Sequence, residues 1–270
     1  MSGYDPSYDL ETAHRMADAA GAAIRPYFRS GLAVENKLTA GFDPVTAADR
    51  ASEQAMRDVL AERAPDDGIL GEEFGETVRD NARRWILDPI DGTRAFIAGL
   101  PTWTVLISLE QAGRPEVGVI DQPHIGERFA GWPGGAALWH GGAKRELRTS
   151  GRTSLDEAIL ATTDAYLFSG DEAAAFERVR RTARLCRFGY DAYAYAMLAA
   201  GGVDLVIESG LQIYDVQAFM PVVQGAGGVV TDWRGGDPSL GGQVVAAASE
   251  ALLESVLPLL AAAARQSVIR

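Results

Sequence analysis

A strand that ends in carboxylates is the feature of this sequence that most constrains its fold. The apolar run at 85–87 predicts a short buried strand, and the segment 88–93, DPIDGT, follows it directly. Pro89 can continue neither a helix nor a sheet ladder, so the strand ends there. An earlier apolar step is followed in the same way by Glu72 and Glu73. We therefore expect two strand ends to lie side by side with their carboxylates together.

Several carboxylates that lie close together repel one another strongly. Two unit charges about 4 Å apart repel by roughly 4 kcal/mol at an effective dielectric constant near 20, so a cation should lie among them. Oxygen ligands favour Mg²⁺, Mn²⁺ or Ca²⁺ over Zn²⁺ or Cu²⁺, and two such strand ends fit two-metal phosphoryl chemistry. After Asp88 and Asp91, Gly92 lets backbone N–H groups approach an anion and Thr93 adds a hydroxyl. The segment therefore predicts a metal site that also binds an anion.

The acidic residues also have purely structural interpretations. Asp88 and Asp91 could be ordinary turn residues, but this interpretation leaves the acidic pair at 72–73 unexplained. Asp49 has the spacing of a capping box with Thr46, and could either cap the second helix or face the metal. Asp215 precedes an apolar helix and could be its N-cap. The metal site is the interpretation that explains the strand-end carboxylates together.

Composition narrows the class of protein. The 270 residues are 47% hydrophobic, which is enough for a sizeable core. A net charge of −12, with the basic residues scattered, argues against a nucleic-acid surface. The single Cys186 excludes an intramolecular disulfide and fits a reducing cytosol. The start shows no signal-peptide pattern, and the apolar stretches are too short or interrupted to span a bilayer. We expect a cytoplasmic enzyme that binds neither nucleic acid nor membrane.

Hydrophobic periodicity predicts two halves of different architecture. Residues 10–28 and a segment from near Thr46 to Pro65 are typical of helices, with Asp9 as the N-cap of the first. From 68 to about 140, short apolar runs between turns predict a mostly antiparallel sheet. Beyond that, helices are expected over 171–183, 191–200, 215–225 and 252–264, and strands over 155–162, 203–207, 229–231 and 244–247. The fold class is thus α+β for residues 1–147 and α/β for residues 148–270, which together complete one active site.

These motifs, in this order, resemble the inositol monophosphatase-type family of magnesium-dependent phosphatases. The resemblance rests on Glu72 and Glu73, the segment 88–93, and Asp215 ahead of a helix that runs into GAGG at 225–228. It spans nearly the whole chain. It implies a layered αβαβα sandwich, with two or three Mg²⁺ ions where the halves meet and Mn²⁺ as a substitute. It also implies a homodimer, for which the periodicity shows no dedicated interface.

The resemblance assigns roles residue by residue. It implies five metal ligands: Glu72, Asp88, the main-chain carbonyl of Ile90, Asp91 and Asp215. Gly92 and Thr93 are expected to hold phosphate oxygens, and Thr93 and Glu72 to orient the water that attacks phosphorus. Asp49 is similar to the aspartate of the family's Thr-Ala-x-Asp segment, and is expected to support catalysis as an outer ligand. Lys37, in the polar loop before the second helix, is either a solvated lysine or part of a lid over the phosphate.

Three further segments look most like the histidinol-phosphate phosphatase branch of the family. They are residues 94–103, 118–123 and 189–195. Two positions depart from the family's pattern, because Ala192 stands where a cysteine is expected and Tyr214 where many members carry tryptophan. The branch implies hydrolysis of L-histidinol phosphate in histidine biosynthesis. The amine of that substrate is expected to pair with Asp191 and Glu208, and Arg94 is the third expected substrate contact.

Other functions stay open on the sequence alone. Inositol 1-phosphate or a sugar phosphate would need hydroxyl partners, which Glu208 also offers. A bisphosphate would need a second basic cluster, and none is evident. A non-catalytic, metal-binding regulatory protein would keep the same pocket, although all the ligands of the motif are present. The sequence therefore favours a phosphatase of a small phosphomonoester.

Overall fold

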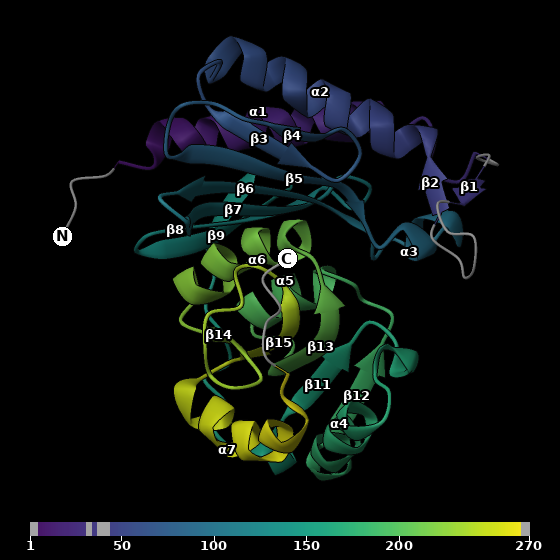
Figure 1. Ribbon diagram of the computed structural model, residues 1–270, viewed down its shortest axis with the longest axis vertical. Helices are drawn as coiled ribbons and strands as arrows, with labels where there is room; N and C mark the ends of the chain where they lie inside the picture. The colour runs from purple at the N-terminus through teal and green to yellow at the C-terminus, as the bar shows by residue number, and fades with distance from the viewer. Residues whose placement is uncertain (1–4, 31–33, 37–43, 266–270) are drawn as a thin grey trace.

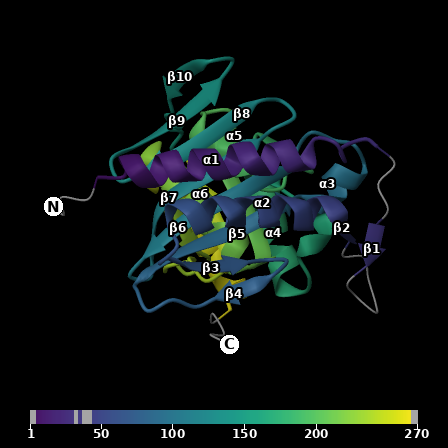
Figure 2. The same cartoon turned by 90° about the horizontal axis from the view of Figure 1, so that it is seen from above.

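The described residues of the computed structural model, 5–30, 34–36 and 44–265, form five layers in the order α/β/α/β/α. Two long helices, α1 (Ser7–Ile24) and α2 (Ala47–Arg63), make the outer layer at the top of Figure 1. Figure 2 looks down on these two helices, which lie across the strands of the first sheet. The layered sandwich expected from the sequence is confirmed.

The first sheet is built from residues 68–146. Its strands are β3 (Gly68–Gly71), β4 (Gly75–Thr77), β5 (Arg83–Asp91), β6 (Thr104–Gln111), β7 (Arg114–Gln122), β8 (Glu127–Trp132), β9 (Gly135–His140) and β10 (Ala143–Glu146). Their spatial order is β10-β9-β8-β7-β6-β5-β3-β4. The described pairs are antiparallel except β3 with β5, which is parallel with Gly71 opposite Leu87. The residues that follow, Glu72 and Asp88, are therefore neighbours, as the sequence predicts.

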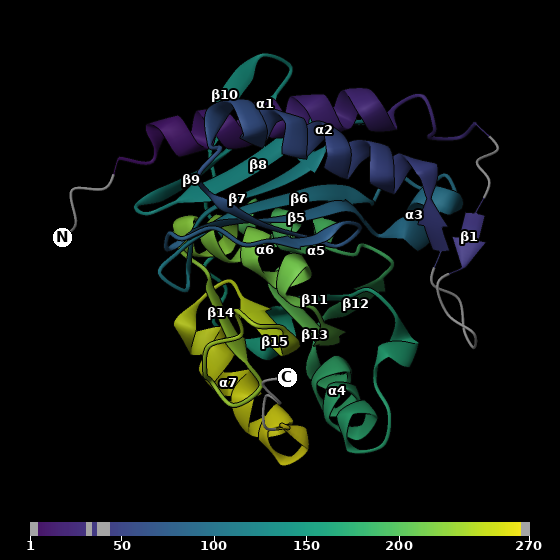
Figure 3. The ribbon, with the colours of Figure 1, turned by 45° about the horizontal axis from the view of Figure 1, so that its top comes forward.

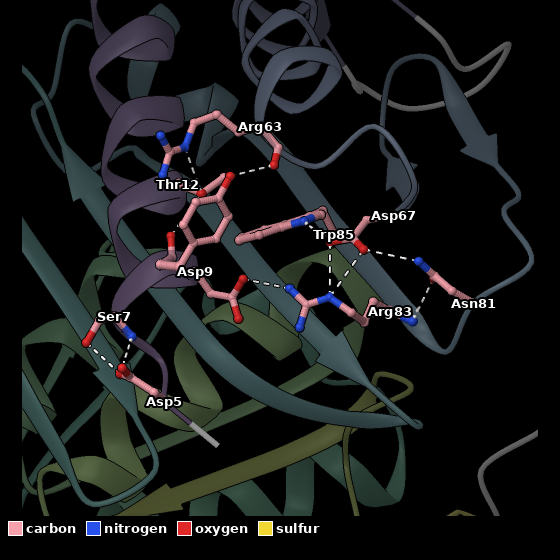
Figure 4. Close-up of polar contacts among 10 residues, drawn as sticks. Asp5, Ser7, Asp9, Thr12, Arg63, Asp67, Asn81, Arg83 and Trp85 are labelled. Carbon is pink, nitrogen blue, oxygen red and sulfur yellow. Dashed lines mark hydrogen bonds and ion pairs between the residues drawn. The ribbon is translucent and has the colours of Figure 1, made fainter. Parts of the chain in front are cut away.

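The outer helices are fixed to this sheet by apolar packing and by a buried polar cluster. Met16, Ile24 and Met56 are fully buried in the core that they share with β5 and β6. Figure 4 shows how Arg83 joins α1 to the sheet, because its guanidinium lies 2.6 Å from Asp9 and 3.2 Å from Asp67. The expectation that Asp9 caps the first helix is wrong, since the helix begins two residues earlier and the Asp9 carboxylate pairs with Arg83.

The middle layer consists of α5 (Tyr193–Ala199) and α6 (Ile213–Gly225). Helix α6 packs so closely on the first sheet that a Cβ atom at Gly118 would lie 1.9 Å from the carbonyl oxygen of Ala218. Pro221 inside α6 has no N–H to give to the Gln217 carbonyl. The Ser108 hydroxyl on β6 lies 3.1 Å from that carbonyl and 3.1 Å from the Val117 carbonyl, and its one proton is shared between the two acceptors. The close approach fixes the position of the N-terminus of α6 relative to β5.

The second sheet lies below, and its outer face is covered by α4 (Asp171–Thr182) and α7 (Glu250–Leu260), as Figure 3 shows. Its strands are β11 (Ile159–Thr162), β12 (Leu185–Phe188), β13 (Leu205–Leu211), β14 (Val229–Asp232) and β15 (Gly242–Ala247), in the order β12-β11-β13-β15-β14. A core around Trp233 joins this sheet to α4 and α7. The division of the chain at residues 147 and 148 stays a proposal.

Several element boundaries differ from the sequence prediction. The segment 155–157 is a short 3₁₀ turn, and the strand predicted over 155–162 begins only at Ile159. The helix predicted over 191–200 begins at Tyr193, because Asp191 has a left-handed backbone with φ of 47°. A short hairpin of β1 (Val34–Asn36) and β2 (Pro44–Thr46) precedes α2. Among the described residues, no helix combines the length and the apolar character that crossing a bilayer requires.

Candidate active site

Three carboxylates converge where the first sheet meets α6. Asp88 and Asp91 end β5, and the register of β5 against β6 shifts between them. Asp215 lies in the first turn of α6, where its Oδ2 accepts the Gln212 N–H at 2.6 Å in a capping box. One carboxylate oxygen from each aspartate lies within 4.8 Å of the others. The interpretation of Asp215 as the N-cap is wrong, because Gln212 is the N-cap and Asp215 is the third helical residue, whose carboxylate accepts the N–H of the N-cap residue. The same side chain also faces the two aspartates of β5.

These carboxylates are in an environment that disfavours their charge. Burial and the negative charges of Glu72, Asp91, Asp215 and Asp49 raise the pKa of Asp88 well above its usual range. Burial and the charge of Asp191 act in the same way on the pKa of Asp91, and burial raises that of Asp215 to about 6. Asp88 Oδ1 is buried without a hydrogen-bond partner among the described residues. A hard divalent cation would satisfy this oxygen and neutralise the cluster, so these residues fit a metal such as Mg²⁺.

Glu72 and Asp49 lie beside this cluster. The Glu72 N–H donates to the Leu87 carbonyl at 3.2 Å, which places Glu72 next to Asp88 across the parallel strands. Asp49, in the first turn of α2, is 2% exposed. Both carboxylates are close enough to contribute to the raised pKa of Asp88. The Thr46 side chain, the other member of the suggested capping box, lies outside the described part of the chain.

The turn after β5 brings Gly92 and Thr93 to the same place. Gly92 has a left-handed backbone with φ of 79°, and a Cβ there would lie 2.9 Å from Asp191 Cγ. Thr93 opens the five-residue helix α3 (Thr93–Ile97), and its hydroxyl donates to the Ile90 carbonyl at 3.1 Å. Glycine is thus required both for the turn and for the approach of Asp191. The expected phosphate contacts of Gly92 and Thr93 stay predictions.

A cavity of about 110 Å³ adjoins the acidic cluster. It is lined by Asp91, Thr163, Leu167, Asp191, Ala192, Tyr195, Glu208, Leu211, Asp215 and Phe219. Burial raises the pKa of Glu208 to about 7, although the Thr163 N–H at 2.9 Å and the Tyr195 hydroxyl at 3.0 Å favour the carboxylate. Burial likewise raises the pKa of Asp191 to about 6, against the opposing charge of Arg94. The cavity thus brings two further acidic residues next to the cluster of Asp88, Asp91 and Asp215.

The other expected site residues are placed less centrally. Arg94 is exposed, and its guanidinium lies 3.5 Å from Asp164. Lys37 lies outside the described residues. Ala192 occupies the position where a cysteine is expected. Its contact with the site is made by the main chain, because its N–H donates to Asp91 Oδ2 at 2.6 Å. The departure therefore leaves this contact intact.

A model of the inositol monophosphatase family matches residues 5–268. The chain belongs to this family. It is 43% identical over 222 residues to the bifunctional phosphatase IMPL2 of Arabidopsis thaliana, covering 82% of this chain but only 63% of that longer relative. It is 34% identical to a histidinol-phosphatase of Chlorobaculum parvum, covering 90% and 93% of the two chains. A solved inositol monophosphatase from Zymomonas mobilis superposes with a TM-score of 0.84 at 40% identity, over 96% of this chain and 99% of that one.

Membership of the inositol monophosphatase family indicates a metal-dependent phosphomonoester hydrolase. The cluster of Asp88, Asp91 and Asp215 is a group that can hold the metal. The relatives at similar identity include both histidinol-phosphatases and inositol monophosphatases. The comparisons therefore leave the substrate open between these two classes.

Sequence reasoning missed the residues that support the site. Thr163 and Tyr195 hold the Glu208 carboxylate, and Glu53 on α2 binds the turn after Glu72. A signal existed for Glu53, because it lies four residues after Asp49 and therefore on the same helix face. The sequence predicts Asp191 and Glu208 as substrate contacts from their charge and from the resemblance of residues 189–195 to the histidinol-phosphate phosphatase branch. Neither their shared cavity nor Thr163 has a local sequence signature.

Proposed function

We propose that this protein is a Mg²⁺-dependent histidinol-phosphatase, which hydrolyses L-histidinol phosphate to L-histidinol and phosphate in histidine biosynthesis. The observation that carries the proposal is the cavity beside the metal cluster, lined by the two carboxylates of Asp191 and Glu208. A substrate with an ammonium group near its phosphate ester suits such a cavity. The similarity to a histidinol-phosphatase over most of both chains supports the same substrate.

The metal would be held by the oxygen ligands at the strand ends and the helix terminus. These are Asp88, Asp91, Asp215, Glu72 and the main-chain carbonyl of Ile90. Two or three Mg²⁺ ions, with Mn²⁺ as a substitute, would lower the pKa of water and neutralise charge on the phosphoryl group. The raised pKa values of Asp88 and Asp91 support this assignment, because burial and mutual repulsion disfavour their charges unless a cation is bound.

The residues around the metal would orient the reactants. Because the Thr93 hydroxyl donates to the Ile90 carbonyl, the lone pairs of its oxygen remain available to accept a hydrogen bond from the attacking water. Glu72 would accept a hydrogen bond from the second O–H of the same water. Asp49 would support the metal site as an outer ligand. Main-chain N–H groups at Gly92 and Thr93 would hold the phosphate oxygens. The exposed guanidinium of Arg94 would contact the substrate.

The substrate's ammonium would lie between Asp191 and Glu208. The left-handed backbone of Asp191 and the approach allowed by Gly92 direct its carboxylate toward the catalytic turn. Glu208 is held from behind by Thr163 and Tyr195, so its orientation is already set before the substrate binds. Preorganised carboxylates of this kind form strong charge-assisted hydrogen bonds with an ammonium.

Steady-state kinetics on a panel of phosphomonoesters tests the substrate. We expect kcat/KM for L-histidinol phosphate to exceed that for inositol 1-phosphate and common sugar phosphates, because only the first offers a cation to the two carboxylates. The variant Glu208→Gln should lose most of this preference while keeping turnover of inositol 1-phosphate. A higher kcat/KM for inositol 1-phosphate would instead favour the inositol or sugar-phosphate alternative, which the similarity to the Zymomonas mobilis structure also supports.

A non-catalytic, metal-binding regulatory role is the alternative from another class of function. Phosphate release is measured with Mg²⁺, without Mg²⁺, and with Asp88→Asn in the presence of Mg²⁺. We expect release only in the first sample. Equal rates in all three would rule out the enzyme.

The homodimer and the cytoplasmic location are also proposals. Light scattering on the eluting protein tests the first, and a mass of one chain, 28.8 kDa, would contradict it. The single cysteine is consistent with a reducing compartment. Fractionation of the source cells tests the location.

A further inference from the structure

The turn that carries Glu72 is held by a buried carboxylate on α2. Glu53 is fully buried, on the same helix face as Asp49. Its Oε2 accepts the N–H of Glu73 at 2.7 Å, and its Oε1 accepts the N–H of Phe74 at 3.3 Å. Glu53 therefore binds the two main-chain amides that directly follow Glu72.

Arg57 completes this arrangement one helical turn later. Its Nε lies 2.8 Å from Glu53 Oε1. Its two terminal nitrogens donate to the Gly75 carbonyl at 2.6 Å and to the Thr77 hydroxyl at 3.1 Å, both on β4. A buried carboxylate is tolerated only when it is paired and fully hydrogen-bonded, and here each oxygen has at least one donor. The ion pair therefore joins α2 to the β3–β4 turn and to β4.

The residue before Glu72 leaves space for this carboxylate. A Cβ atom at Gly71 would lie 1.9 Å from Glu53 Oε1 and 2.3 Å from its carboxyl carbon. The Glu53 carboxyl group therefore lies directly against the backbone of Gly71. On the other side, the Glu72 N–H donates to the Leu87 carbonyl of β5. The main chain on both sides of Glu72 is thus fixed, by α2 through Glu53 and by β5 through the strand ladder.

We infer that Glu53, with Arg57, is a positioning residue for the metal site. It touches neither the metal nor the substrate, and acts by fixing the backbone that presents the Glu72 carboxylate to Asp88. The inference rests on the proposed role of Glu72 as a metal ligand. Ligand carboxylates bind well only when a supporting shell holds their orientation, and loss of such support weakens metal affinity by about 10- to 100-fold.

The variant Glu53→Gln tests this inference. Glutamine keeps the size of the side chain, but its amide nitrogen must face one of the donors that the carboxylate now accepts, so the turn after Glu72 loses a hydrogen bond. Mg²⁺ binding is measured by isothermal titration calorimetry on the metal-free full-length protein. We expect about 10-fold weaker binding or more, and the Mg²⁺ concentration for half-maximal phosphate release should rise by the same factor. The matched control is Glu62→Gln, on an exposed position of the same helix, which should bind Mg²⁺ like the wild type.

A second variant covers the case in which Glu53→Gln fails to fold by near-ultraviolet circular dichroism. Arg57→Lys keeps the charge beside Glu53 but loses the fork that reaches Gly75 and Thr77, so we expect a smaller loss of Mg²⁺ affinity, about threefold to 10-fold. Wild-type Mg²⁺ affinity in the folded Glu53→Gln protein, or in Arg57→Lys where the first does not fold, would overturn the inference, even if the melting temperature falls. A wild-type protein that does not bind Mg²⁺ would instead overturn the proposed metal site, and the inference with it.

Discussion

At the scale of single residues, the site consists of carboxylates that the fold buries close together, where their negative charges are unfavourable unless a cation is bound. Asp88 is buried beside several other carboxylates, and its pKa is raised accordingly. The same repulsion that destabilises the metal-free protein creates the attraction for a cation. Removing one of these charges should therefore make the metal-free protein more stable and at the same time weaken its binding of the metal.

We expect Asp88→Asn to stabilise the metal-free protein and to abolish its stabilisation by Mg²⁺. Above the ordinary carboxyl pKa, Asp88 loses its proton readily in the unfolded chain, whereas in the folded chain its raised pKa opposes this loss. The free energy of unfolding therefore falls as pH rises. Relief of the repulsion between Asp88 and its neighbouring carboxylates at pH 8 should raise the free energy of unfolding of the metal-free protein. Urea denaturation with EDTA and with Mg²⁺ measures both effects. The exposed Asp66→Asn serves as control, and a variant less stable than wild type without metal would contradict the prediction.

The protonation of Glu208 should make the preference between the two substrate classes depend on pH. Burial raises the pKa of Glu208 to about 7, and the other titratable groups that line the same cavity are Asp91, Asp191, Tyr195 and Asp215. Below pH 7 Glu208 takes up a proton and loses its attraction for an ammonium, whereas a protonated carboxyl can still bind a hydroxyl. The ratio of kcat/KM for L-histidinol phosphate to that for inositol 1-phosphate should therefore fall as pH decreases from 8 to 6.

The ratio is the useful measure because titration of the metal ligands affects both substrates alike. A fall of about threefold or more is expected from loss of one charge-assisted hydrogen bond. Glu208→Gln should show a smaller fall, confined to the lower end of this range, where Asp191, with a pKa of about 6, takes up a proton. A wild-type ratio that does not change with pH would exclude Glu208 as the ammonium partner.

At the scale of elements, α6 has to lie almost in contact with the backbone of the first sheet. Gly118 allows this approach on β7. We expect Gly118→Ala to destabilise the protein by about 1–3 kcal/mol, because the new Cβ meets the Ala218 carbonyl and not a movable side chain. It should also weaken Mg²⁺ binding, since displacement of α6 carries Asp215 away from Asp88.

Chemical denaturation and calorimetric Mg²⁺ titration measure the two effects of Gly118→Ala. The control is Gly202→Ala, where an added Cβ would approach the Met197 carbonyl no closer than 3.6 Å and the backbone is not left-handed. A variant that loses stability but binds Mg²⁺ with wild-type affinity would show that the position of α6 does not determine that of Asp215.

The sequence predicts elements best where their signals are local. The carboxylates at the ends of β3 and β5 could be read from apolar runs and turn residues, and the two strands do lie side by side. Short or exposed elements gave no such signal: α3 has five residues, and Leu185 and Phe188 of β12 are both exposed. The resemblance pointed to Asp215, but its approach to Asp88 depends on tertiary packing through Gly118. The support of Glu208 by Thr163 is likewise non-local.

At the scale of the whole molecule, the three aspartates of the candidate metal site come from both sides of the proposed division at residue 147. Asp88 and Asp91 come from the first sheet, and Asp215 comes from a helix that also covers the second. A ligand that binds only the folded arrangement stabilises it by about 2.7 kcal/mol at 100 times its Kd. For a chain of this size, that corresponds to a rise in melting temperature of roughly 5–10 °C.

We expect this rise to occur in a single calorimetric transition, with Mg²⁺ and with EDTA, because α6 is packed against the first sheet and belongs to the core shared with the second. Trp85 and Trp233 lie in the separate cores of the two sheets. The other three tryptophans, at 103, 132 and 139, belong to the first half, so fluorescence of Trp233→Phe reports the first half alone, whereas wild-type fluorescence also includes Trp233. The two signals should therefore show the same midpoint and the same Mg²⁺-dependent shift. An equal ionic strength of NaCl controls for screening. Two separated transitions in EDTA, or a shift in one fluorescence signal alone, would mean that the halves unfold independently and that the metal stabilises only one of them.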